Sequence, residues 1–104
     1  MIRPYKFIVT IELHPGTRDE ILARAPEAQA ATRAEPGCLT YDCFTCIDDP
    51  NRLVFVEAWT DEIAYAEHLL QEHTQRFLEF YEPFHRSYTF EIITAGLECA
   101  TRSP

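Results

Sequence analysis

Apolar and polar residues follow two different periods along this chain, and the changes of period divide it into elements. Over residues 5–13 apolar and polar positions alternate one by one, which is typical of a strand with one buried face. Further strands are predicted over 38–47, 53–59 and 87–95. Residues 48–51, with the sequence DDPN, have the composition of a turn, so the second and third strands are expected to form an antiparallel hairpin.

A first helix is predicted to follow the first strand and to run to about Ala34. Thr17 offers a hydroxyl for the N-cap, and Glu20, three residues later, completes a capping box. Pro26 lies within the helix, so a kink or a fresh start is expected there, and the Pro-Gly pair at 36–37 ends the helix. The predicted inner face carries Ile21, Leu22, Ala25 and Ala28.

A second helical region is predicted from Thr60 or Asp61, one of which supplies the N-cap, to about Phe84. The helical period slips over 71–74, which indicates two short helices in place of one. The inner positions are predicted to be Ile63, Ala66 and Leu70, and then Phe77, Phe80 or Tyr81, and Phe84.

The element order β-α-β-β-α-β predicts an α+β, ferredoxin-like fold, with an antiparallel sheet and helices on one face. The 104 residues allow one domain, 1–104, with a core over about 5–95 and a tail at 96–104. The third strand places Val54, Val56 and Ala58 on the face that the helices do not cover. Because this second apolar face also needs a cover, a homodimer that packs two sheets face to face is expected.

Charge narrows the range of partners. Nine basic and seventeen acidic residues give a formal charge of −8, so the chain is not expected to bind nucleic acid or an anionic membrane surface. Its apolar stretches are too short to cross a bilayer. The first residues alternate in polarity and lack the apolar region of a secretory signal, which favours a cytoplasmic location.

Neither a metal nor a flavin is expected. Cys43 and Cys46 form a CxxC pattern, but residues three apart on a strand point to opposite faces, and no second CxxC completes a ligand set. His68 and His73 would lie about 140° apart on a continuous helix. The other histidines are scattered, and the three glycines make no phosphate-binding loop. The cysteines are therefore expected to be reduced structural thiols.

Three short motifs in a fixed order connect the chain to a known family. They are Glu35-Pro36-Gly37-Cys38-Leu39-x-Tyr41, then Glu57-x-Trp59-x-Asp61, then His68 and His73 ahead of Phe77. In order and spacing they resemble the antibiotic biosynthesis monooxygenase domain. The resemblance implies a dimeric α/β barrel with a pocket between sheet and helices in each subunit. It also implies members that oxidise quinol-like or polyketide aromatics without flavin or metal, degrade haem, or isomerise small metabolites.

The resemblance carries over residue by residue only in part. Trp59 matches a pocket tryptophan, and Tyr65 matches a tyrosine of the polyketide-oxidising branch. Phe55 stands where that branch has an asparagine, so holding a substrate phenol through an amide is not implied here. Val9 and Leu78 stand near the asparagine and the haem-ligating histidine of the haem-degrading branch, so haem degradation is disfavoured.

The strongest chemical candidate is Glu57, a carboxylate within an apolar strand. In a pocket, burial would raise its pKa and make it a general base, and the alternative is a structural hydrogen-bonding partner. His73, at the helix break, is either a proton shuttle or a helix cap, and His68 is interpreted as structural. Trp59 is either a pocket wall or a core residue, and Tyr41 is interpreted as core.

These residues favour a cofactor-independent monooxygenase that acts on a small aromatic or quinol-like compound. Glu57 and His73 would be catalytic, and Phe55, Trp59 and Tyr65 would bind the substrate. Two alternatives stay open. One is a small-molecule isomerase that uses Glu57 and His73 as acid and base, and the other is a non-catalytic dimeric module that binds a hydrophobic metabolite.

Overall fold

The computed structural model describes residues 3–93, and its element order is the expected one. The C-terminal tail predicted at 96–104 and the last two residues of the predicted core lie outside the described residues. The elements are β1 (Tyr5–Leu13), α1 (Arg18–Arg33), β2 (Cys38–Thr45), β3 (Arg52–Trp59), α2 (Glu62–Leu69), α3 (Glu72–Tyr81), a 3-10 turn (Glu82–Phe84) and β4 (His85–Ile93).

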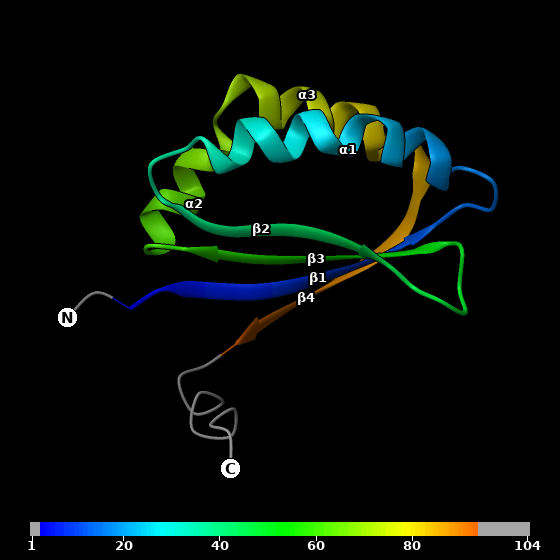
Figure 1. The fold of residues 1–104 in the computed structure, drawn as a ribbon, viewed down its shortest axis with the longest axis horizontal. Coiled ribbons are helices and arrows are strands. Elements are labelled where there is room, and N and C mark those ends of the chain that lie inside the picture. Colours follow the sequence, from blue (N-terminus) through cyan, green and yellow to red (C-terminus); the bar gives the residue numbers. More distant parts are fainter. Residues whose placement is uncertain (1–2, 94–104) are drawn as a thin grey trace, which may run out of the picture.

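The four strands form one antiparallel sheet in the order β2-β3-β1-β4, and the helices lie on one side of it (Figure 1). β2 and β3 form the expected hairpin, and the backbone N–H of Asn51 donates to Asp49 Oδ1 at 2.9 Å within its turn. The α+β, ferredoxin-like fold predicted from the element order is therefore confirmed.

The core lies between the helices and the centre of the sheet. Phe7 on β1 and Leu53 and Trp59 on β3 are completely buried there. Val54 and Val56 alternate with these residues on β3, point to the uncovered face and are half-buried. Both faces of the central strand are thus apolar, as the sequence predicts.

The start of α1 differs from the prediction. The Thr17 hydroxyl donates to the backbone carbonyl of His14 at 2.7 Å and makes no hydrogen bond to the helix, so the predicted capping box with Glu20 is wrong. α1 also continues through Pro26, where a kink or a fresh start was expected. Pro26 lies on the exposed side of the helix, where water can hydrate the carbonyl that loses its N–H partner.

The predicted inner face of α2 is wrong by about one position. Ile63 and Leu70 are largely exposed, whereas His68 is buried and Tyr65 is half-buried. The helix is anchored by aromatic contacts, such as Tyr65 against Phe7 with ring centroids 4.8 Å apart. A hydropathy pattern counts histidine and tyrosine as polar, and for this reason it selects the wrong face.

Two predictions about the second helical region are confirmed. The Asp61 side chain accepts a hydrogen bond from the backbone N–H of Ala64 at 2.8 Å, as an N-cap does. The region is divided into α2 and α3, and the division falls at Leu70 and Gln71. This break changes the direction of the chain directly after His68, which matters for the site below.

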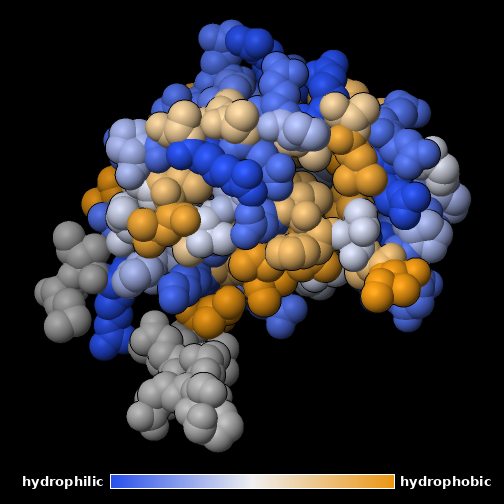
Figure 2. All heavy atoms as spheres, in the orientation of Figure 1, coloured by the Kyte–Doolittle hydropathy of each residue, from blue (hydrophilic) through white to orange (hydrophobic). Residues whose placement is uncertain are grey.

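β4 is an edge strand whose apolar side chains are exposed. Tyr88, Phe90 and Ile92 lie on the same side of the sheet as Phe7 and the helices, but they remain exposed, although Tyr65 on α2 reaches the ring of Phe90. In Figure 2 the outer surface of the helix layer is mostly hydrophilic, and hydrophobic residues gather lower in the view, along the strands. Among the described residues no helix is long and apolar enough to cross a membrane.

Candidate functional site

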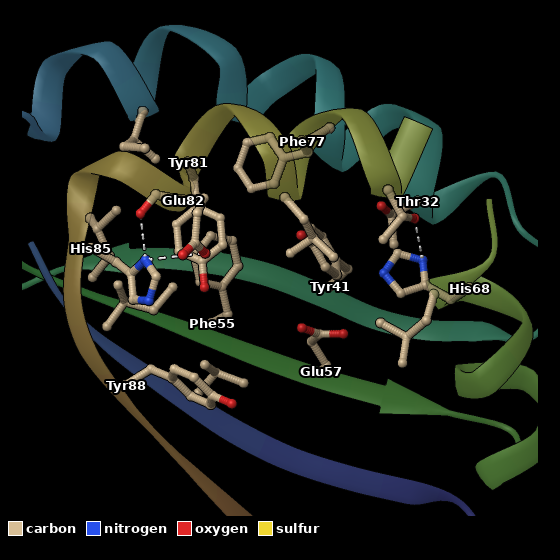
Figure 3. Close-up of a pocket in the computed structure, with 18 of the residues that line it drawn as sticks. Thr32, Tyr41, Phe55, Glu57, His68, Phe77, Tyr81, Glu82, His85 and Tyr88 are labelled. Atoms are coloured by element: carbon tan, nitrogen blue, oxygen red, sulfur yellow. Dashed lines mark hydrogen bonds and ion pairs between the residues drawn. The ribbon is translucent and has the colours of Figure 1, made fainter. Parts of the chain in front are cut away.

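A cavity of about 390 Å³ lies between the sheet and the helices. This volume falls within the range of small-molecule sites. Its floor is formed by β1 and β3, and its roof by α1 and α3, and β4 borders one side (Figure 3). Most lining side chains are apolar or aromatic, among them Val9, Leu53, Phe55, Phe77, Tyr81 and Phe90.

Glu57 supplies a carboxylate to the floor of this cavity. It lies on β3 in one row with Phe7 on β1 and Tyr41 on β2, and it is only 8% exposed. Burial raises its pKa to about 7, the charge of Glu35 adds to the rise, and a hydrogen bond from the Trp59 indole opposes it. The carboxylate therefore changes its charge near neutral pH, as the sequence analysis expects for a pocket residue.

Trp59 lies behind Glu57 and is not among the residues that line the cavity. Its ring is fully buried, and its Nε1 donates to Glu57 Oε1 at 3.1 Å. The ring also packs on His68, with centroids 4.6 Å apart. The structure thus does not bring the tryptophan to the cavity as the predicted wall, because its neighbour two positions earlier on β3 occupies the floor.

Phe55 and Tyr65 both line the cavity, as predicted. Phe55 packs against Tyr41, with ring centroids 5.8 Å apart, and the two cover the floor beside Glu57. Burial, assisted by the charge of Glu57, raises the pKa of Tyr65 to about 12. The hydroxyl of Tyr65 is therefore a hydrogen-bond donor at neutral pH.

His68 and His73 meet at one carboxylate. His68 Nδ1 lies 2.7 Å from Glu35 Oε2, and His73 Nε2 lies 2.9 Å from the same oxygen. The Thr74 hydroxyl is 3.2 Å from His68 Nδ1. On a continuous helix the two histidines were expected to lie on different sides. The break between α2 and α3 brings their rings together, so that prediction is wrong.

The cluster of Glu35, His68 and His73 also has the composition of a metal site, and its ligand atoms lie within 4.8 Å of one another. No such cluster was expected from the sequence. The contacts to Glu35 are nevertheless hydrogen-bond distances. Two ligands of a tetrahedral zinc ion, each about 2.0–2.1 Å from the metal, lie about 3.3 Å apart. The observed spacing fits two N–H donors on one carboxylate oxygen.

Glu35 was not among the candidate residues predicted from the sequence, and His68 was predicted to be structural. Both have little exposed side-chain surface, and His68 lines the cavity. Glu35 comes close to α2 because the neighbouring Gly37 has no side chain. A Cβ at position 37 would lie 2.5 Å from the Cβ of Ala64 on α2. The Glu-Pro-Gly sequence at the end of α1 was the available signal, because it places a carboxylate where only glycine permits close packing.

The CxxC pattern takes no part in this site. Cys43 lies on β2 and packs against the core, and Cys46 follows the end of that strand. Cys38, Cys43 and Cys46 are free thiols, and burial raises the pKa of Cys43 to about 11. Cys99 lies outside the described residues.

The fold and the cavity together define a small α+β protein with a mainly apolar cavity between sheet and helices and an ionisable carboxylate on its floor. The family model described as "Antibiotic biosynthesis monooxygenase" matches residues 4–79. The chain belongs to the antibiotic biosynthesis monooxygenase family.

Individual relatives agree with this assignment. The chain is 35% identical over 68 residues to "Putative monooxygenase YcnE" of Bacillus subtilis, across 65% of this chain and 72% of that protein. A solved structure described as an antibiotic biosynthesis monooxygenase has a TM-score of 0.81 at 32% identity, covering 88% of this chain and 97% of its own. PA3566 from Pseudomonas aeruginosa has a TM-score of 0.80 at 29% identity, covering 86% and 91%.

Proposed function

We propose that this chain is a cofactor-independent monooxygenase that oxidises a small aromatic or quinol-like compound in the cavity above Glu57. The observation that carries the proposal is Glu57 itself, a carboxylate on the floor of an apolar cavity with a pKa raised to about 7. A base whose pKa lies near the working pH is deprotonated in a large fraction of the molecules, and it still binds a proton strongly enough to remove it from a substrate.

The reaction starts with removal of a phenolic proton. The O–H bond of the substrate breaks, its proton moves to Glu57, and the electron pair stays on the aromatic anion. This electron-rich anion reduces dioxygen directly, so that one oxygen atom enters the ring system and the other leaves as water. The protein contributes a proton acceptor and a shaped site that excludes water.

The cavity lining supports a flat, apolar substrate. Phe55, Phe77, Tyr81 and Phe90 present aromatic surface, which a fused or substituted ring fills by stacking and shape. Phe55 offers no amide to a substrate hydroxyl, so Tyr65 is the residue we assign to hydrogen-bond an oxygen of the ligand. His73, which also lines the cavity, is assigned a supporting role in proton transfer through Glu35, since its Nε2 lies 2.9 Å from Glu35 Oε2.

Oxygen uptake tests the proposal. Purified protein is mixed with a panel of quinols, naphthols and anthrones in an oxygen-electrode cell, and products are analysed after incubation in ¹⁸O₂. We expect catalytic oxygen consumption and one ¹⁸O atom in the product. An isomerase would convert a substrate without consuming oxygen, and a binding module would be stabilised by a ligand without turnover. Either result would replace the proposed function.

A further inference from the structure

We propose that His68 is a second catalytic acid–base group of the cavity and that Glu35 is the residue that positions it. This inference rests on the proposed oxidation of a phenolic substrate and deepens it. It also changes the role of His68, which sequence reasoning interpreted as structural.

The two ring nitrogens of His68 face different surroundings. His68 Nδ1 faces Glu35 Oε2 at 2.7 Å and the Thr74 hydroxyl at 3.2 Å. Figure 3 shows the other ring nitrogen turned into the cavity, toward the space between Tyr41 and Glu57. The ring thus spans the wall of the site, with one nitrogen on the protein network and the other on the ligand space.

Glu35 fixes the tautomer of His68. A carboxylate oxygen only accepts hydrogen bonds, so the proton of a neutral His68 must lie on Nδ1. Nε2 then carries the free lone pair, which is the state a proton acceptor needs. Burial lowers the pKa of His68, and the hydrogen bond and charge of Glu35 oppose this effect. His68 is therefore neutral before the reaction, and its protonated form is stabilised by an adjacent carboxylate.

His73 completes the clamp on Glu35. Its Nε2 lies 2.9 Å from the same carboxylate oxygen, so the oxygen is held between two imidazoles. Trp59 fixes the His68 ring from another side, with centroids 4.6 Å apart. A base whose orientation is set by a third group is the arrangement that proton-transfer sites share.

The proposed oxidation needs a second proton acceptor besides Glu57. A substrate RH₂ and dioxygen give R=O and water, so both protons of that water come from the substrate. The site must therefore hold two protons between their removal and the departure of water. Glu57 can hold one of them. Nε2 of His68 can hold the other and return it to the departing oxygen, which restores both groups for the next turnover.

The tautomer can be tested without any substrate. In protein labelled with ¹⁵N-histidine, long-range ¹⁵N–¹H spectra at pH 7.5 should show His68 protonated on Nδ1 and unprotonated on Nε2. The Glu35→Leu variant, which has no acceptor, should lose this single tautomer, whereas Glu27→Leu on the exposed side of α1 should keep it. An Nε2–H tautomer in the wild-type protein would overturn the proposal. Stoichiometric metal in the purified protein would also overturn it, because Nδ1 would then be a metal ligand.

The catalytic role is tested by His68→Asn, in which the amide can still donate to Glu35 but the cavity-facing nitrogen is removed. On a substrate that the wild-type protein oxidises, kcat should fall by about 100-fold with KM little changed. His14→Asn, at an exposed histidine outside the cavity, should behave as wild type. If His68→Asn keeps its kcat, the inference fails and the proposed function stands. If the wild type consumes no oxygen with any phenol, the proposed function fails together with this catalytic role, and the spectra still decide the tautomer.

Discussion

Strands β3 and β4 flank β1 on opposite sides, and both direct apolar side chains toward the helix side of the sheet. On β3 these side chains are Leu53, Phe55 and Trp59, and all three are buried. On β4 the side chains that point to this side, Tyr88, Phe90 and Ile92, remain exposed. The same alternation thus produces a closed core on one flank and an open edge on the other.

The difference comes from what covers each strand. α1 packs against β2 and α2 against β3, whereas among the described residues no helix packs extensively against β4, and all the helices lie on one side of the sheet (Figure 1). Tyr88 and Phe90 therefore border the cavity from its open side, whereas Glu57 lies on its closed floor. The proposed chemistry lies on the closed side, and the open side offers exposed apolar surface. Four predictions test this division.

The largest effect is expected at the sheet face opposite the helices. In the predicted homodimer this face, which includes Val54 and Val56, is covered by the same face of a second chain, with an interface on the order of 2,000 Å². Val56→Asp would bury two unpaired carboxylates per dimer and should weaken dimerisation by about 1,000-fold or more. Sedimentation velocity at micromolar concentration measures this change.

Val56→Thr, of the same shape and uncharged, is the matched control and should remain a dimer. Phe90→Glu on β4 separates the two apolar surfaces, because it charges the open edge and leaves the opposite face intact. A Val56→Asp protein that sediments as a dimer, or a Phe90→Glu protein that becomes the monomer instead, would move the interface to β4. A monomeric wild-type protein would remove the predicted dimer altogether.

The second prediction compares a carboxylate on each strand. Glu57→Gln keeps the shape of the buried side chain on β3 but cannot accept a proton, so kcat for oxygen uptake should fall by about 100- to 1,000-fold. Glu91→Gln removes an exposed carboxylate on β4 and should leave kcat within about twofold of wild type. Full turnover by Glu57→Gln on a confirmed substrate would end the catalytic role of this residue.

The third prediction concerns stability and pH. The pKa of Glu57 is raised from an ordinary 4.5 to about 7 in the folded protein, so between these values the native state binds more protons than the unfolded state. Stability should therefore fall as the pH rises from about 4.5 through 7, by about 3 kcal/mol in total. Urea unfolding of wild type at pH 5 and pH 8 measures the fall.

Glu57→Gln is the control for this effect, because a neutral amide does not titrate. The difference in unfolding free energy between wild type and variant should be small at pH 5 and should grow toward pH 8, where the variant is the more stable protein. Parallel pH curves for the two proteins would show that Glu57 is charged and well solvated in the folded state, contrary to its burial on β3.

The sequence predicts β3 better than it predicts the surroundings of His68. Alternation places Phe55, Glu57 and Trp59 on one face, and the structure confirms that face because neighbours on a strand have no other choice. It does not decide which of the three borders the cavity. That depends on the rings that fill the adjacent space, and here Glu57 is in the cavity while Trp59 lies behind it.

The cluster at Glu35 could not be predicted from local sequence patterns, for a different reason. Its members come from the end of α1, from α2 and from α3, and they meet because of a helix break and one glycine contact. The slip in periodicity over 71–74 indicated the break, but not the angle between the two helices. Without that angle, His68 and His73 could only be placed on an ideal continuous helix, which separates them.

The smallest effect is expected at Trp59, behind the floor. Trp59→Phe removes the indole N–H that donates to Glu57 and leaves a small cavity. The free energy of unfolding should therefore fall by about 1–2 kcal/mol. Since that hydrogen bond lowers the pKa of Glu57, its loss should move the pKa upward from about 7. The acidic limb of the kcat profile should then shift to higher pH. Circular dichroism must follow unfolding, because Trp59 is the only tryptophan.

Phe44→Leu, at a largely exposed aromatic residue on β2, should change stability by less than about 0.5 kcal/mol. An unchanged or lowered pKa in Trp59→Phe would show that the indole only fills space, and that the closed side of the cavity does not tune its own base.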